Sequence, residues 1–97
     1  MVKHIIIWKL REGIDKKAQA ALIKSELEGL VGRIDGLRRM CIITDSLPSS
    51  SGDVMMDSEF DSCEALSAYQ IHPEHKRVAT EVVRPFVDIR LSYDYEI

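Results

Sequence analysis

The residues best suited to chemistry are concentrated in one short segment, Tyr69-Gln70-Ile71-His72-Pro73-Glu74-His75. It holds two of the three histidines and one of the three tyrosines of the chain. A neutral imidazole accepts a proton near pH 7, and a phenol donates a hydrogen bond to a carbonyl oxygen. These residue types predict an acid–base site in which His75 is the catalytic general base and Tyr69 is the donor to a developing oxyanion.

Pro73 predicts a junction between two helices inside this segment. Proline lacks an N–H group and pushes the preceding residue out of the α region, so a helix that begins near Ser62 should end near Ile71. His72 then becomes the N-cap and Pro73 the first residue of the next helix. His75 falls in the first turn, where the positive end of the helix dipole disfavours a protonated ring. A His-Pro junction also simply breaks and restarts a helix; this structural interpretation applies to His72 and stays open for His75.

The periodicity of apolar residues divides the rest of the chain into strands and helices. Alternation with a period of two predicts strands over residues 3–10, 39–45, 53–60 and 87–95. Helical spacing predicts a helix from Asp15 to the region of residues 32–36, a second from 62 to 71, and a third from 73 to 84. The order β-α-β-β-α-β is typical of the α+β ferredoxin-like fold, a four-stranded antiparallel sheet with two helical segments on one face.

The first predicted strand is apolar on both of its faces, and this pattern predicts a homodimer. Ile5 and Ile7 point to one side, while His4, Ile6 and Trp8 point to the other. Helices cover one face of such a sheet, so we expect a second copy to cover the other and to enclose a cavity between or beside the two sheets. On this interpretation an aspartate in place of Ile6 disrupts assembly and folding together.

Composition and charge exclude several classes of protein. A chain of 97 residues, with 45% hydrophobic and 30% charged residues, predicts a single globular domain over residues 1–97. The net charge of −3 and the isolated basic pairs argue against a nucleic-acid partner. No apolar run is long enough for a membrane span or a signal peptide. Cys41 and Cys63 form no CxxC motif, and we expect two buried thiols in a reducing cytoplasm.

Four segments of the chain together resemble the stress-responsive A/B barrel, or Dabb, family. They are the strand His4–Leu10, the run Ser58–Ser62, the Tyr-x-x-His-Pro-x-His segment and the ending Asp94-Tyr95-Glu96. The resemblance extends over essentially the whole chain and implies a dimeric α/β barrel. At the Tyr-x-x-His-Pro-x-His motif the chain is similar to a plant branch of the family, which cyclises polyketides by an aldol route without metal or organic cofactor. That similarity implies working roles for Tyr69 and His75, and matches His4 to the histidine that begins the branch's first strand.

Three hypotheses for function follow. The first is a ligand-binding or stress-related protein without a reaction, with a small apolar ligand lined by His4, Ile6, Trp8, Met56 and His72. The second is a cofactor-independent cyclase or lyase acting on a small carbonyl compound, in which Trp8 and Met56 restrict the length of the substrate. The third is a metal site made of His72, His75 and His4, which lacks a fourth ligand; we therefore expect neither a metal nor a cofactor.

Overall fold

The computed structural model describes residues 1–97 and contains four strands and three α-helices. Two short turns of other helical types follow α3: a π-helical turn (Ala79–Val83) and a 3-10 turn (Arg84–Phe86). The order along the chain is β1 (Val2–Leu10), α1 (Lys16–Glu28), β2 (Leu37–Ile43), β3 (Val54–Phe60), α2 (Cys63–Ile71), α3 (Pro73–Val78) and β4 (Val87–Glu96). No helix is long and apolar enough to cross a membrane.

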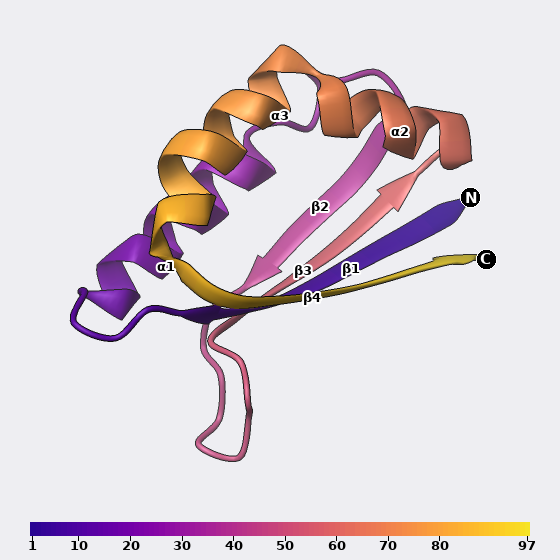
Figure 1. The fold of residues 1–97 in the computed structure, drawn as a ribbon. Helices are drawn as coiled ribbons and strands as arrows, with labels where there is room; N and C mark the ends of the chain where they lie inside the picture. The colour runs from indigo at the N-terminus through magenta and orange to yellow at the C-terminus, as the bar shows by residue number, and fades with distance from the viewer.

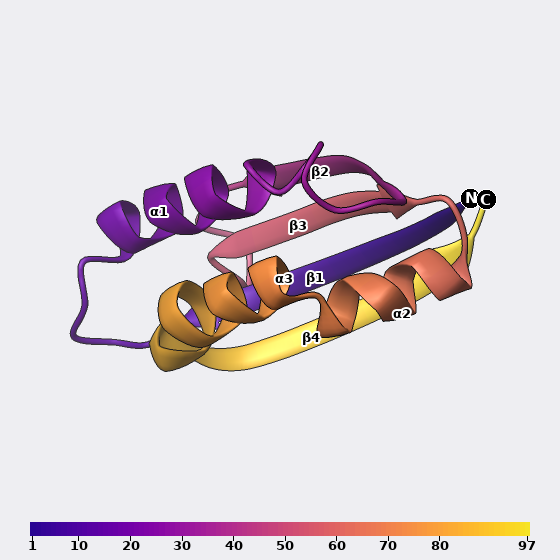
Figure 2. The same ribbon diagram turned by 90° about the horizontal axis from the view of Figure 1, so that it is seen from above.

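The four strands form one antiparallel sheet in the order β2-β3-β1-β4. The three α-helices lie on the same side of this sheet (Figure 1), and the view from above shows α1 beside the α2–α3 pair (Figure 2). The two chain termini meet at one end of the neighbouring strands β1 and β4, where the Ile97 N–H donates to the Met1 carbonyl at 2.9 Å. The predicted α+β ferredoxin-like fold is confirmed.

Short polar side chains begin the helices where the sequence predicted. Asp15 accepts a hydrogen bond from the Ala18 N–H at 3.1 Å, and Ser62 does the same for Ala65 at 3.1 Å. His72 is the N-cap of α3, because its Nδ1 accepts from the Glu74 N–H at 3.1 Å. Each cap satisfies a backbone donor that has no partner within its helix.

The end of α1 differs from the prediction. The helix stops at Glu28 and not in the region of residues 32–36, because the chain turns through two glycines with positive φ, Gly32 and Gly36. Leu30 and Ile34 are still buried, but they reach the core from this turn. Val31 continues the helical spacing of Leu27 and Leu30 but is 42% exposed, since the helical register no longer applies beyond the helix end.

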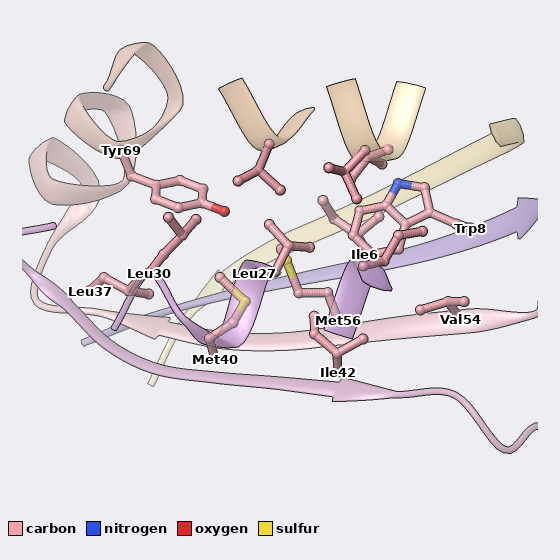
Figure 3. Close-up of a cluster of buried hydrophobic side chains, with 14 of the residues drawn as sticks. Ile6, Trp8, Leu27, Leu30, Leu37, Met40, Ile42, Val54, Met56 and Tyr69 are labelled. Atoms are coloured by element: carbon pink, nitrogen blue, oxygen red, sulfur yellow. The ribbon is translucent and has the colours of Figure 1, made fainter. Parts of the chain in front are cut away.

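The core lies between the sheet and the helices, and it shows which of the two apolar faces of β1 the helices cover. Ile6 and Trp8 are 5% and 4% exposed and pack beneath the helices (Figure 3). Ile6 is therefore a core residue, and an aspartate there disrupts the fold of one protomer without reporting on assembly. Ile7 points to the opposite face and is 41% exposed.

The sheet face away from the helices is open and carries a band of apolar side chains. We call it the open face. Leu91 is 63% exposed and Tyr93 is 71% exposed, and the band also contains Ile7, Ile43, Ile89 and Tyr95. The β2–β3 loop projects from the sheet on the side opposite the helices (Figure 1). An exposed apolar band of this kind marks an interaction surface.

The expectation of two buried thiols is wrong for Cys63. It is the first residue of α2 and is exposed, because the first turn of this helix lies at the rim of the molecule. Cys41 is partly buried, and both cysteines are free.

Replacing Gly36 with alanine is expected to destabilise the fold by about 1–3 kcal/mol. The backbone φ of Gly36 is +83°, and a Cβ there would lie 2.6 Å from the Cβ of Ala65 on α2. Gly32→Ala is the matched control, because its φ is +88° and nothing lies within 4 Å of the added Cβ. Denaturant unfolding should show the larger loss for Gly36→Ala; equal losses would mean that the contact with Ala65 relaxes freely.

Candidate functional site

A cavity of about 570 Å³ lies inside the protomer, between the sheet and the helical layer. Six of the seven predicted site residues line it: His4, Ile6, Trp8, Met56, Tyr69 and His75. The cavity was expected between or beside two sheets, but it is formed by one chain alone. The difference arises because His4, Ile6 and Trp8 face the helices and not the open face.

Tyr69 and His75 form a ring pair on the wall of the cavity. Their ring centroids are 4.2 Å apart, with an interplanar angle of 41°. The Nδ1 atom of His75 lies 3.3 Å from the carbonyl oxygen of Gln70, the residue after Tyr69. A carbonyl only accepts hydrogen bonds, so Nδ1 carries the proton and the neutral ring keeps its lone pair on Nε2. In this tautomer the ring can take up a proton at Nε2.

Burial lowers the pKa of His75 below its usual value of 6.5. The cationic groups of Arg84 and Arg90 lower this pKa further, while the hydrogen bond to Gln70 opposes the shift. The direction agrees with the sequence-based prediction, and desolvation of the ring is the largest cause of the lowered pKa. His75 is therefore neutral at pH 7.

Tyr69 is positioned as a hydrogen-bond donor. The residue is 1% exposed, and its ring extends from α2 toward the sheet with the hydroxyl leading (Figure 3). Burial raises the pKa of this phenol above 10.0, so it keeps its proton across the neutral range. No fully buried side-chain oxygen or nitrogen lacks a hydrogen-bond partner in this structure. The Tyr69 hydroxyl has no partner, so its oxygen is not fully buried and is accessible to a ligand in the cavity.

His4 reaches the same cavity from β1 and is held by a partner at the far end of the sequence. Its Nδ1 is hydrogen-bonded to an Asp94 carboxylate oxygen on the neighbouring strand β4. Its ring lies edge-on to Phe60 at 6.3 Å, and Phe60 in turn lies 4.9 Å from Tyr69. Phe60 thus packs against both His4 and Tyr69 and helps to hold the Tyr69 ring in place.

His72 is the one predicted ligand-binding residue that the structure does not bring to the cavity. Its Nδ1 caps α3, as the structural interpretation of the His-Pro junction expected. The hypothesis of a metal site from His72, His75 and His4 finds no support in the geometry, because no three His, Cys, Asp or Glu side chains converge around a common point.

Trp8 and Met56 form walls of the cavity without filling it. Tyr69 and Trp8 lie at opposite ends of the labelled side-chain cluster, with Leu27, Ile6 and Met56 between them (Figure 3). Apolar walls that end in a few polar groups are typical of small-molecule sites. The room that remains accommodates a small ligand.

The polar residues on the other side of the cavity were missed from the sequence. Arg84, Asp88 and Arg90 line it from the 3-10 turn and from the start of β4. The π-helical turn before them also contributes Ala79 and Val83 to the wall. Sequence alone predicted a regular helix there, although the π-helical turn widens the backbone, as the Arg84 N–H bonds to the Ala79 carbonyl. Such turns often occur at functional sites.

The architecture and the cavity define a ferredoxin-like α+β protein with a cavity covered by its helices. The family model described as the Stress Responsive A/B Barrel Domain, Dabb, matches residues 2–97. The chain belongs to the Dabb family. Among proteins with curated descriptions, none matches it.

Solved structures with the same fold cover nearly the whole chain. A dimeric protein of unknown function from Bacteroides fragilis is 28% identical, with a TM-score of 0.90 over 99% of this chain and 95% of that one. A Dabb family protein from Mesorhizobium loti is 18% identical, with a TM-score of 0.80 over 99% and 95%. A hydroxynitrile lyase from Passiflora edulis is 19% identical, with a TM-score of 0.83 over 99% and 92%. The last two likenesses show the fold alone.

Proposed function

We propose that this protein is a homodimer that binds a small carbonyl compound in its cavity and catalyses proton transfer at the carbon next to the carbonyl group. The observation that carries this proposal is the pairing of Tyr69 and His75 on the wall of an open cavity. One is a phenol held in its protonated form and the other an imidazole held in its neutral form. Acid–base chemistry of this kind needs only these side chains and no cofactor.

The reaction follows from the two protonation states. The Nε2 atom of His75 takes a proton from the carbon next to the carbonyl. The electrons of that C–H bond form a carbon–carbon double bond, and the π electrons of the carbonyl group move to its oxygen. Tyr69 donates a hydrogen bond to the resulting enolate oxygen, which stabilises the developing charge. The enolate carbon then either recovers a proton from the imidazolium or bonds to a second carbonyl carbon. In the second case the oxygen of that second carbonyl takes the proton from the imidazolium, so His75 returns to its neutral form on either route.

A second candidate function is ligand binding without chemistry, which is favoured by the apolar character of much of the cavity wall. Ile6, Trp8 and Met56 would contact such a ligand, and the two histidines would only satisfy hydrogen bonds. The open cavity beside His75 favours the enzyme over this alternative. The hydroxynitrile lyase with the same fold supports the capacity of this fold to host an active site, although 19% identity assigns no residue roles here.

The homodimer is supported by the open face. Its exposed aliphatic and aromatic side chains share one sheet face and form an apolar band of the kind that marks a protein–protein interface. The relative from Bacteroides fragilis, 28% identical, is described as dimeric. A second pocket, lined by the β2–β3 loop together with Ile7 and Leu91, is open toward this face and would receive the partner. Two free cysteines fit the reducing cytoplasm in which we place the protein.

Deuterium exchange tests the reaction across a panel of small carbonyl compounds. The protein is incubated in D₂O with each compound, and NMR follows the replacement of hydrogen by deuterium at the carbon next to the carbonyl. We expect exchange above the uncatalysed rate for compounds that bind. Compounds that shift the His75 ring resonances but exchange no faster than in buffer would identify a binding protein instead.

A further inference from the structure

Two arginines on the cavity wall have no partner within the chain. Arg84 begins the 3-10 turn, and Arg90 lies on β4 opposite Trp8; both are exposed at the solvent side of the cavity. The remaining arginines all have partners: Arg33, Arg38, Arg39 and Arg77 form ion pairs, and Arg11 donates to the Pro85 carbonyl. The unpaired guanidinium groups are therefore confined to the cavity.

The charge of the cavity wall suits an anion with a single charge. Asp88 is the only acidic residue that lines the cavity, and its carboxylate forms no ion pair with Arg84 or Arg90 within 4.0 Å. Among the residues that line the cavity, two arginines against one aspartate leave an excess of one positive charge; Asp94, which is not one of them, is engaged by His4. A carboxylate matches this charge, and the planar guanidinium binds its two oxygens through parallel hydrogen bonds. A phosphate dianion would exceed it.

We infer that the cavity selects carbonyl compounds that carry a carboxylate, which Arg84 and Arg90 bind at the mouth while the carbonyl group lies against Tyr69 and His75. This inference rests on the proposed function and names its substrate class. A carboxylate held between the arginines also offsets the positive charges that face His75. The imidazolium that forms on proton transfer is then repelled less strongly by the two arginines. The contact that holds the substrate therefore also assists the reaction.

Matched pairs of acids and amides test the inference. The ligands are a series of β-keto carboxylates of increasing chain length and their primary amides, which keep the shape and lose the charge. Affinities are measured by NMR titration for the unaltered protein, for Arg84→Gln, Arg90→Gln and the double variant. Arg33→Gln is the control, because it removes the same charge from a residue that is paired with Glu74 and lies outside the cavity.

The unaltered protein should bind the acids about tenfold or more tightly than the amides, and the double variant should lose this preference while amide affinity stays unchanged. Arg33→Gln should retain it, and circular dichroism should show every variant folded. Equal affinities for acids and amides, or no binding by any acid, would overturn the inference.

Measuring deuterium exchange on the same samples separates this inference from the proposed function. An arginine-dependent preference for acids without any exchange would refute the proposed reaction and support the ligand class. Exchange at equal rates and equal affinities for acids and amides would support the reaction and overturn the ligand class.

Discussion

Replacing His75 with alanine is expected to lower the rate of proton exchange by about 10²–10⁴-fold, the usual effect of losing a general base. The ring lies 4.2 Å from Tyr69 on the cavity wall and its Nε2 is free to accept a proton. Tyr69→Phe should have a smaller effect, because it deletes one hydrogen bond to the enolate and keeps the buried ring in place. Both are measured as exchange rates in D₂O, with ligand affinity determined separately.

His72→Ala is the matched control for this experiment. His72 is the same residue type, three positions earlier at the same helix junction, but it caps α3 and lies outside the cavity. The His72→Ala substitution should lower the free energy of unfolding by about 0.5–2 kcal/mol through loss of the helix cap, and it should leave the exchange rate nearly unchanged. If His72→Ala slows exchange as much as His75→Ala, the loss of rate comes from disturbing the helix junction and not from removing a general base.

The pH dependence gives an independent check on the two roles. The pKa of His75 is lowered from 6.5, so the fraction of neutral base, and with it kcat/KM, should rise with pH below 6.5 and reach a plateau before neutrality. Burial raises the pKa of Tyr69 above 10.0, so no decline should follow up to that pH. A rate that is highest on the acid side of 6.5 is incompatible with a neutral His75 acting as the base.

The second large effect is expected on assembly. Leu91→Asp should raise the dimer dissociation constant by at least about a hundredfold, because it places an unpaired charge in a buried apolar interface. Leu91 is 63% exposed in the protomer, so the fold of each chain should persist. Light scattering and sedimentation at several concentrations would measure the change from dimer to monomer.

Leu22→Asp provides the comparison for assembly. Leu22 is an exposed leucine on α1, at 44%, but it lies in the helical layer and not on the open face. The same substitution there should leave the dimer intact. Dissociation by both variants alike, or by neither, would show that the open face is not the interface.

The sequence by itself determined the order of strands and helices, and it determined which residues of a strand share a face of the sheet. Alternation along a strand depends only on the backbone period of two, so the residues that share a face with Ile6 were identified correctly. Pro73 fixed the helix junction and made His72 a cap for equally local reasons, since its ring removes a donor and restricts its neighbour. The Tyr-x-x-His-Pro-x-His segment likewise marked the two residues that pair in the cavity.

The helix end after Glu28 was less accessible to sequence reasoning. Leu30, Val31 and Ile34 continue a helical spacing, and only the observed turn through glycines with positive φ shows that Val31 is exposed. The regular helix expected after Pro73 changes to a π-helical turn at Ala79 for a comparable reason. In both places the apolar pattern persists while the hydrogen bonding of the backbone changes.

Only the tertiary structure decided where the cavity lies and what surrounds it. Both faces of β1 are apolar, so the pattern could not say whether the helices cover Ile6 or Ile7; packing of the helical layer on Ile6 settles this and places the cavity inside one protomer. Asp94 reaches His4 across 90 residues of sequence, and Arg90 reaches the cavity from the edge strand. Such contacts depend on strand order and register, which bring distant residues together through non-local hydrogen bonding that no local pattern encodes.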